Sequence, residues 1–504
     1  MTFFNQLDKS HLPRWFWPLL LSVNFLFHLP FFRLPPASVH VWRQADTMAV
    51  ARNFYEEGMN ILEPRVDSRY ATTGITGMQF PSYEWLVASS YHLFGFHEVL
   101  PRLINWLIYM AGVVVFYHLV HLISGQAWLG GVGAWFLSWS PDFYYHGANA
   151  LPDILALTAS MAGLLGFMQW RAKRNGLLLI LSLVAVTLGG LTKLQYQIVG
   201  FPIAFFVVRD LVQRRFSGRE LFQLVAYAIV SVSVSLSWYA YALHLMDTSG
   251  LGNFGLELRP ALDMATGLHI IKRNLLSDWP EILLGYGALI LFVVGLWRLL
   301  RHPPTQHPWF GPGLTWGVTL ISYYLIELSQ MQGHTYYMFP LLPVLLLIAV
   351  WGFAWLARFP QAKPLLLVLL LIQPVWAYIR INYTRLQRQE LDVAVELLDP
   401  VTRATLEQAT PPGALCVVGP DPSSCINFYF LHKKGFPFTW SGQLLESRAT
   451  GRSRLADYVA GGARYLYTND TLFVKDPHVQ PYLEQHVKQV GAFGVWKLFP
   501  PATQ

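Results

Sequence analysis

"WFWPLLLSVNFLFHLPFF", residues 15–32, is the stretch that decides the fold class of this chain. It holds no charged side chain, and as a helix it is long enough to cross about 30 Å of hydrocarbon. It lacks a small-residue cleavage site and leads into further apolar runs, so it predicts a retained first membrane helix rather than a secretory signal. We therefore expect an integral membrane protein.

Apolar runs of this kind recur over the first 380 residues. Hydrophobic residues make up 54% of the 504 residues and charged residues only 13%, which is typical of a chain solvated by lipid. We predict a mainly α-helical, polytopic transmembrane bundle of about eleven spans. The spans are expected near residues 15–32, 102–123, 128–140, 151–170, 177–191, 197–212, 221–245, 282–300, 314–329, 337–356 and 365–378.

Basic residues indicate the orientation of these spans. They cluster in alternate connections, which the positive-inside rule places in the cytoplasm. The clusters lie near residues 9–14, 171–174, 209–219, 298–301 and 358–363. The first connection, the later connections 140–153 and 329–337, and the tail then lie on the opposite face. Because the cations behind the net charge of +7 follow this topology, we expect membrane lipids as partners and no nucleic acid.

The sequence predicts two domains. Residues 1–380 form the transmembrane catalytic domain, with its first external connection at 33–101, and residues 381–504 form a small extracytoplasmic α/β domain. Polar helical patterning after residue 385 is followed by short strand-forming runs, "ALCVVGP" and "ARYLYTND". The tail holds both cysteines, Cys416 and Cys425, which form a disulfide if this part faces an oxidising compartment and are otherwise two free thiols.

The first external connection is too polar to span a membrane and too patterned to be disordered. Apolar residues recur at helical spacing over residues 40–55, and again over 80–95, where Pro81 opens the helix and Gly95 ends it. We expect both helices to lie along the membrane surface.

A carboxylate, Asp46, lies on the first of these helices, on the face of Trp42 and one turn after Arg43. Two interpretations are open. An Arg43–Asp46 pair on a solvated helix contributes only a few tenths of a kcal/mol. Alternatively, a carboxylate beside lipid headgroups and a guanidinium is placed to accept a proton from a hydroxyl nucleophile next to an anionic lipid.

An ordered set of motifs resembles a known family. These motifs are "WRQADT", "ARNFYEEGMNILEPR", "FPSYEWLVASSYHLFG", "RLINWL", "ALPDILALTASMAGLLGF", "GLTK" and "YYMFPLLPVLLLIA". In this order and spacing they resemble the bacterial membrane glycosyltransferases of the GT-C superfamily, of the branch related to protein O-mannosyltransferases and to the lipid A aminoarabinose transferase. The resemblance covers most of residues 1–360.

The resemblance implies an inner-membrane hexosyl- or pentosyltransferase that moves a sugar from a polyprenyl-phosphate carrier to an envelope lipid, glycan or protein on the external face. It implies that Asp46 is the general base. Relatives often carry an acid before the "FP" of the second helix, where this chain has Met78 and Gln79, and Glu84 one turn later is the possible substitute. We therefore predict no metal, and no cofactor. Attack opposite the leaving phosphate would invert the anomeric configuration.

The remaining candidate residues are assigned to substrate binding, some with a competing structural role. Lys193 either binds the donor phosphate or extends toward the headgroups, and Asp153 either orients a sugar hydroxyl or caps a helix. The aromatic candidates either line the carrier site or form an interfacial belt. The full set of substrate-binding candidates is Arg43, Gln44, Glu84, Arg102, Asp153, Lys193, Arg259, Arg273, His334, Tyr336 and Tyr337.

Two other functions compete with this interpretation. A transporter or flippase for lipid-linked sugars would need polar residues through the middle of many spans, whereas this chain keeps them at the external ends. A glycan polymerase or ligase that uses a diphosphate carrier would share the topology and the external site. The sequence does not discriminate between this last enzyme and a single-sugar transferase.

Overall fold

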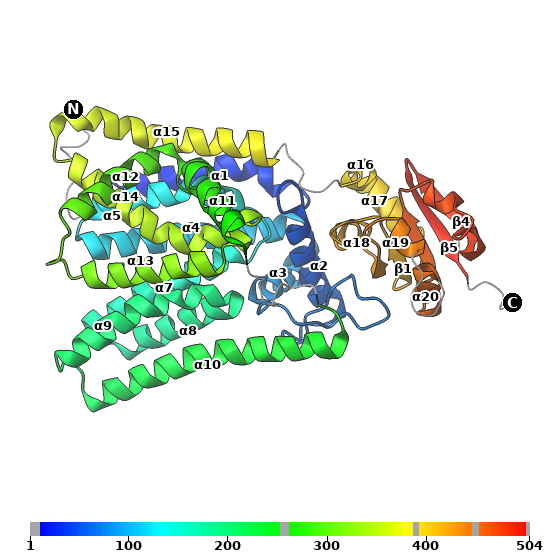
Figure 1. Ribbon diagram of the computed structural model, residues 1–504, viewed down its shortest axis with the longest axis horizontal. Helices are drawn as coiled ribbons and strands as arrows, with labels where there is room; N and C mark the ends of the chain where they lie inside the picture. Colours follow the sequence, from blue (N-terminus) through cyan, green and yellow to red (C-terminus); the bar gives the residue numbers. More distant parts are fainter. Residues whose placement is uncertain (1–10, 253–261, 387–392, 446–452, 500–504) are drawn as a thin grey trace. The chain divides into compact units, whose positions relative to one another are not determined.

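The computed structural model describes residues 11–252, 262–386, 393–445 and 453–499. The chain is mostly helical, with a small sheet near the C-terminus, as the sequence predicts (Figure 1). Its contacts divide it into two compact units. The first, here the helical unit, takes in Met1–Arg33, Arg102–Ala240 and Leu256–Thr384, and the second, here the mixed unit, takes in Leu34–Pro101, Tyr241–Gly255 and Arg385–Gln504.

The helical unit contains most of the apolar segments. Its α-helices are α1 (Phe16–Phe32), α4 (Val99–Ser124), α5 (Ala127–Ser138), α6 (Pro141–His146), α7 (Asp153–Lys173), α8 (Gly176–Thr192), α9 (Gly200–Val212), α10 (Gly218–Ser249), α11 (Met264–Arg273), α12 (Gly285–Arg301), α13 (Phe310–Ile326), α14 (Leu342–Leu356) and α15 (Lys363–Ile381). α10 continues into the mixed unit.

Five helical segments among the described residues are long and apolar enough to cross a membrane, which identifies an integral membrane protein. They are Val99–Ser124, Gly218–Ser249, Met264–Arg301, Thr335–Leu356 and Pro360–Leu386. Shorter apolar helices occur at Phe16–Phe32, Ala127–Ser138 and Gly176–Thr192. The count of about eleven spans that hydropathy suggests is therefore not confirmed, and it stays a prediction.

Small residues let helices of the helical unit approach closely. α12 packs along α14, and there Gly295 lies against Gly352, where an added Cβ would collide with the backbone of the facing helix. Such close contacts are how helices associate in lipid, where burial of apolar surface gives no net gain between helices. Consistently, large apolar side chains such as Phe222 (73% exposed) and Ile326 (75% exposed) stay on the surface.

The mixed unit combines the first long connection, residues 34–101, with the C-terminal tail. Its helices are α2 (Val41–Glu57), α3 (Ser82–Phe94), α16 (Val395–Leu398), α17 (Pro400–Glu407), α18 (Ile426–Leu431), α19 (Gly442–Leu445) and α20 (Arg454–Ala460). Its strands are β1 (Leu415–Val418), β2 (Lys434–Pro437), β3 (Tyr465–Thr468), β4 (Leu483–Val490) and β5 (Phe493–Leu498). The helices expected over 40–55 and 80–95 are confirmed as α2 and α3.

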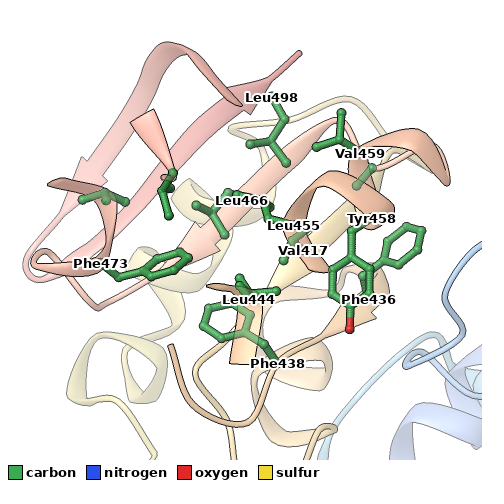
Figure 2. Close-up of a cluster of buried hydrophobic side chains, with 13 residues drawn as sticks. Val417, Phe436, Phe438, Leu444, Leu455, Tyr458, Val459, Leu466, Phe473 and Leu498 are labelled. Atoms are coloured by element: carbon green, nitrogen blue, oxygen red, sulfur yellow. The ribbon is translucent and has the colours of Figure 1, made fainter. Parts of the chain in front are cut away.

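The five strands form one sheet in the order β2-β1-β3-β5-β4. β1 pairs in parallel with β2 and β3, whereas β5 runs antiparallel to β3 and β4. A hydrophobic cluster covers this sheet and includes Val417, Phe436, Leu466 and Leu498 from its strands (Figure 2). The predicted strand runs in "ALCVVGP" and "ARYLYTND" are confirmed as β1 and β3.

The first long connection extends this sheet at the β2 edge. The Gly435 amide donates to the Asp67 carbonyl at 3.0 Å, and the amides of Arg69 and Tyr70 donate to the Gly435 carbonyl at 3.0 and 2.8 Å. Gly435 has a φ of 141°, and a Cβ there would collide with the Cys416 carbonyl, so only glycine fits between β1 and this segment. Backbone hydrogen bonds thus fix residues 67–70 against β2.

Candidate active site

α2 carries Asp46 in a nearly buried ion pair. The helix begins after His40, whose φ of 62° turns the chain sharply, and it ends at Gly58, whose φ is 126°. The Arg43 guanidinium donates to Asp46 Oδ2 at 3.0 Å, and the side chains of the pair are only 9% and 14% exposed. The interpretation of Arg43 and Asp46 as a solvated surface pair is therefore wrong. Because both side chains are nearly buried, loss of either partner costs more free energy than loss of a surface ion pair does.

Burial also shifts the protonation of Asp46 and Glu84. Removal from water raises the pKa of Asp46 to about 6, with Arg43 opposing this shift and Asp67 adding to it. Burial raises the pKa of Glu84 to about 7, again against the charge of Arg43, and the Gln79 amide donates to Glu84 Oε1 at 3.1 Å. Burial thus raises the pKa values of two carboxyl groups on different helices toward neutral pH, and the charge of Arg43 opposes both shifts.

Asp46 lines a pocket of about 150 Å³ within the mixed unit. Its wall is formed by α2, by residues 66–68 of the first long connection and by the loop before α18. The lining residues are Trp42, Asp46, Ala49, Val66, Asp67, Ser68, Ser423, Ser424 and Cys425. Asp46 Oδ1 accepts no hydrogen bond from the described residues, so this oxygen is available to a ligand in the pocket.

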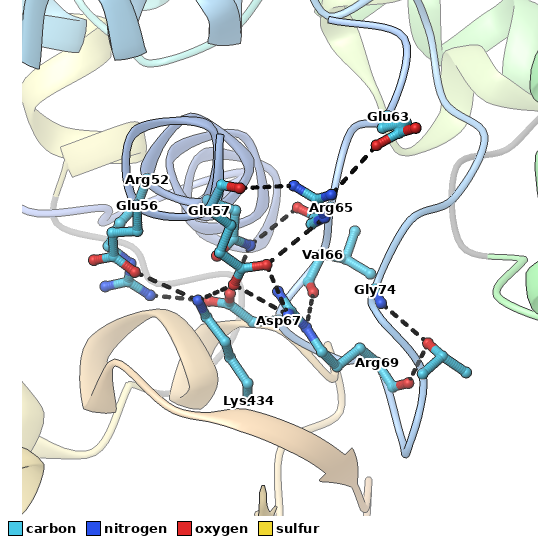
Figure 3. Close-up of polar contacts among 12 residues, drawn as sticks. Arg52, Glu56, Glu57, Glu63, Arg65, Val66, Asp67, Arg69, Gly74 and Lys434 are labelled. Carbon is cyan, nitrogen blue, oxygen red and sulfur yellow. Dashed lines mark hydrogen bonds and ion pairs between the residues drawn. The ribbon is translucent and has the colours of Figure 1, made fainter. Parts of the chain in front are cut away.

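A buried polar network holds the second carboxylate of the pocket, Asp67. The Arg52 guanidinium donates to Asp67 Oδ2 at 2.9 Å, and the Asn53 amide donates to Oδ1 at 2.8 Å. Arg52 also donates to the Tyr429 carbonyl at 3.0 Å, which ties α2 to α18. Figure 3 shows Arg52 and Asp67 beside a second, more exposed set of ion pairs that includes Lys434 of β2.

The helical unit brings together several candidates that lie far apart in the sequence. Lys193, at the end of α8, lies 2.7 Å from Asp153 Oδ1 and 4.6 Å from the ring centres of both Tyr336 and Tyr337. The His334 ring lies 5.6 and 5.9 Å from these two rings. An ammonium held by a buried carboxylate and two aromatic faces is therefore the centre of a second candidate cluster.

Two competing roles proposed for this cluster do not fit its geometry. Asp153 is the first residue of α7, whose N-cap is Pro152 with no side-chain capping bond, so the capping role is wrong. Lys193 is only 9% exposed and pairs with Asp153 inside the unit, which differs from a lysine extended toward headgroups.

The remaining candidates lie in other surroundings. Arg102 is buried and donates to the Ala148 carbonyl and to Asn149 Oδ1, at 3.0 and 3.1 Å. The Gln44 amide donates to the Ala37 carbonyl at 2.9 Å. Arg273 is half exposed and lies 3.5 Å from Asp278, while Arg259 lies outside the described residues. Arg102 and Gln44 thus each donate a hydrogen bond to a nearby backbone carbonyl.

Sequence reasoning missed much of the pocket. Asp67, Ser68 and the loop 423–425 are polar residues in connections without periodicity, and only the pairing of residues 67–70 with β2 brings them to α2. Both cysteines are free thiols, which decides against the disulfide alternative. Within the described ranges, no group of three or more His, Cys, Asp or Glu side chains is arranged to hold a metal ion.

A protein-family model matches part of the sequence, and solved structures match the fold. The family model described as dolichyl-phosphate-mannose-protein mannosyltransferase matches residues 79–238. No curated protein matches the sequence.

Solved structures match nearly the whole chain. The crystal structure of ArnT from Cupriavidus metallidurans in the apo state has a TM-score of 0.62 at 13% identity, covering 97% of this chain and 99% of that one. The crystal structure of this ArnT bound to undecaprenyl phosphate has a TM-score of 0.62 at 14% identity, covering 98% and 100%. The archaeal oligosaccharyltransferase AglB from Archaeoglobus fulgidus, in complex with an inhibitory peptide and a dolichol-phosphate, has a TM-score of 0.56 at 12% identity, covering 96% and 74%. These likenesses show a shared fold, and together with the family model over residues 79–238 they support the resemblance to the GT-C superfamily.

Proposed function

We propose that this integral membrane protein, which shares the fold of GT-C membrane glycosyltransferases, transfers one sugar from a polyprenyl-phosphate carrier to an envelope acceptor. The donor class rests on the family model, whose description names a dolichyl-phosphate sugar, and on the solved relatives, which are bound to undecaprenyl phosphate and to a dolichol-phosphate. We place the transfer on the non-cytoplasmic face because the clusters of basic residues predict this orientation by the positive-inside rule.

Asp46 acts as the general base in this proposal. The observation that carries it is a carboxylate with a free oxygen, in a pocket, with its pKa raised to about 6 by burial. At neutral pH it is ionised but basic enough to take a proton, which is the compromise that general-base catalysis needs. The acceptor O–H bond breaks, its proton goes to Asp46, and the acceptor oxygen attacks the anomeric carbon.

The bond from the anomeric carbon to the phosphate oxygen breaks in the same displacement, and polyprenyl phosphate leaves with the electron pair. Attack from the face opposite the phosphate inverts the configuration and needs no covalent sugar–enzyme step. We assign the phosphate to the Lys193 cluster, because an ammonium among aromatic faces, paired with the buried carboxylate of Asp153, can exchange that partner for phosphate oxygens.

The test uses cells that lack the gene and carry it back on a plasmid as the native form, Asp46→Asn or Glu63→Gln. Glu63 is the matched control, because its carboxylate is 41% exposed and pairs with Arg65 outside the pocket. We expect mass spectrometry of envelope glycans to show one sugar added by the native and Glu63→Gln forms and none by Asp46→Asn, at equal protein in the membrane. Transfer by Asp46→Asn would remove the base from the mechanism, and addition of a long chain would identify a polymerase or ligase instead.

A further inference from the structure

The pocket beside Asp46 contains polar groups that the fold itself leaves without partners. The Ser68 side chain lines the pocket, is 5% exposed, and its hydroxyl has no hydrogen-bond partner among the described residues. An unpaired buried hydroxyl costs free energy, and almost all such groups in native proteins are satisfied by protein, water or a ligand. Ser424, which also lines the pocket, is half-buried, and its side chain makes no hydrogen bond to the described residues.

Other polar groups of the same pocket are already used by the fold. Both oxygens of Asp67 accept hydrogen bonds from α2, and the Ser423 hydroxyl donates to Asp421 Oδ1 at 2.6 Å. Asp421 also accepts from the Ser423 amide at 2.8 Å and from the Asn427 amide at 2.9 Å. These bonds fix the loop 419–425, "GPDPSSC", against the start of α18. The unpartnered hydroxyls are therefore held in place before any ligand binds.

The free groups differ in kind and converge on one small space. The ionised Asp46 carboxylate can accept hydrogen bonds through Oδ1 but cannot donate one, whereas the hydroxyls of Ser68 and Ser424 can both donate and accept. The ring of Trp42 supplies an apolar surface in the same pocket. A ligand that satisfies all of these groups carries several neighbouring hydroxyls on a compact frame with apolar C–H faces, which is the chemistry of a sugar ring. A serine or threonine side chain offers a single hydroxyl.

We propose that this pocket binds one sugar residue of the acceptor, so that the acceptor is a glycan or the glycan part of a lipid. Ser68 and Ser424 hold the hydroxyls next to the one that Asp46 deprotonates, and the loop 419–425 gives the C-terminal tail its role in acceptor recognition. This inference rests on the proposed function only where it says which hydroxyl reacts. The proposal that the pocket binds a sugar is argued from Ser68, Ser424 and Trp42 alone.

The experiment measures binding without a donor, so that it does not depend on transfer. The full-length protein, in a detergent without a sugar headgroup, is mixed with the methyl glycosides of glucose, galactose, mannose and N-acetylglucosamine, or with N-acetylthreonine amide, and saturation-transfer NMR reports binding. The variants are Ser68→Ala and, as the control, Ser90→Ala, whose native hydroxyl donates to the Val87 carbonyl on α3 away from the pocket.

We expect at least one methyl glycoside to bind the native protein and the Ser90→Ala control equally. Ser68→Ala should weaken this binding about five- to tenfold, the value of one or two neutral hydrogen bonds. Because the Ser68 hydroxyl has no protein partner, Ser68→Ala should leave the melting temperature unchanged or raise it, which separates a ligand contact from a structural role.

Three results would overturn the inference: no glycoside binds, Ser68→Ala binds as the native protein does, or the threonine amide binds with the same dependence on Ser68. The last result would assign the pocket to a protein acceptor. Failure of the proposed function looks different, because Asp46→Asn would then still transfer sugar in cells while the dependence of glycoside binding on Ser68 persists.

Discussion

Replacement of Arg52 by methionine should loosen the contact between residues 67–70 of the first long connection and β2. The Arg52 guanidinium lies 2.9 Å from Asp67 Oδ2, and the two side chains are 5% and 2% exposed. Arg52→Met leaves the Asp67 carboxylate buried without its counter-charge, and breaking a buried pair in this way costs about 3–5 kcal/mol. The backbone amides of Arg69, Tyr70 and Gly435 form the hydrogen bonds of this contact, so faster exchange of their hydrogens with solvent should measure its loss of stability.

Hydrogen exchange followed by mass spectrometry measures this loss in peptides that cover residues 66–72 and 432–438. A cost of 3–5 kcal/mol corresponds to exchange about 150- to 4,000-fold faster in both peptides. The control is Arg65→Met, because Arg65 is 17% exposed and its partners Glu57 and Glu63 are 25% and 41% exposed, so its removal should cost under about 1 kcal/mol.

The double variant Arg52→Met with Asp67→Asn separates charge from packing. With no carboxylate left unpaired, much of the protection should return, because replacing both members of a buried pair is often nearly neutral. The reasoning would be refuted if Arg52→Met exchanged no faster than Arg65→Met, or if the double variant were no better protected than the single one.

Substitutions at three further positions test other parts of the structure. Although burial opposes it, hydrogen bonds to Glu407 and Glu56 raise the pKa of His432, so its contribution to stability is complete below its ordinary pKa of 6.5 and is lost as pH rises through the raised value. The melting temperature should therefore fall less between pH 5.5 and 8.5 in His432→Gln than in the native protein, and an equal fall in both would contradict this role. Lys193→Ala should raise the apparent KM for the donor about tenfold. Lys193→Arg should stay within about threefold of the native KM, because the arginine keeps a cation for the phosphate. Equal KM values for the native protein and both variants would exclude Lys193 from donor binding. Gly435→Ala should speed exchange of the peptide 66–72, since the added Cβ meets the Cys416 carbonyl, and unchanged exchange would contradict the tight fit of the glycine.

The membrane helices could be predicted from the sequence because their signal is local. The apolar run at residues 102–123 predicts a membrane helix by itself, and the structure has the candidate span α4 there. The helices α2 and α3 could be predicted from the helical spacing of their apolar residues and from their end residues. The strands β1 and β3 were visible for the same reason, as short apolar runs before turn residues. The number of membrane crossings could not be predicted in this way, because helix length in the structure depends on packing as well as on hydropathy.

The site could be predicted only in part, since it depends on contacts between distant segments. Lys193 and Asp153 were identified one by one, and their meeting 2.7 Å apart needed the packing of α7 against α8. Asp67 and Ser68 carry no pattern at all, because their position comes from backbone pairing with Gly435 more than 360 residues later in the chain. Resemblance to a family could indicate Asp46 but not the groups that surround it.

The pH dependence of kcat/KM for sugar transfer tests the central claim about Asp46 most directly. Since this quantity reports the free enzyme, the account predicts that the rate rises with pH through about 6, where the buried Asp46 becomes ionised. Arg43 lowers the pKa of Asp46, so Arg43→Gln should move the inflection to higher pH, whatever it does to the maximal rate. An inflection at the same pH in both proteins, or a rate independent of pH from 4.5 to 8, would contradict the assignment of Asp46 as the base.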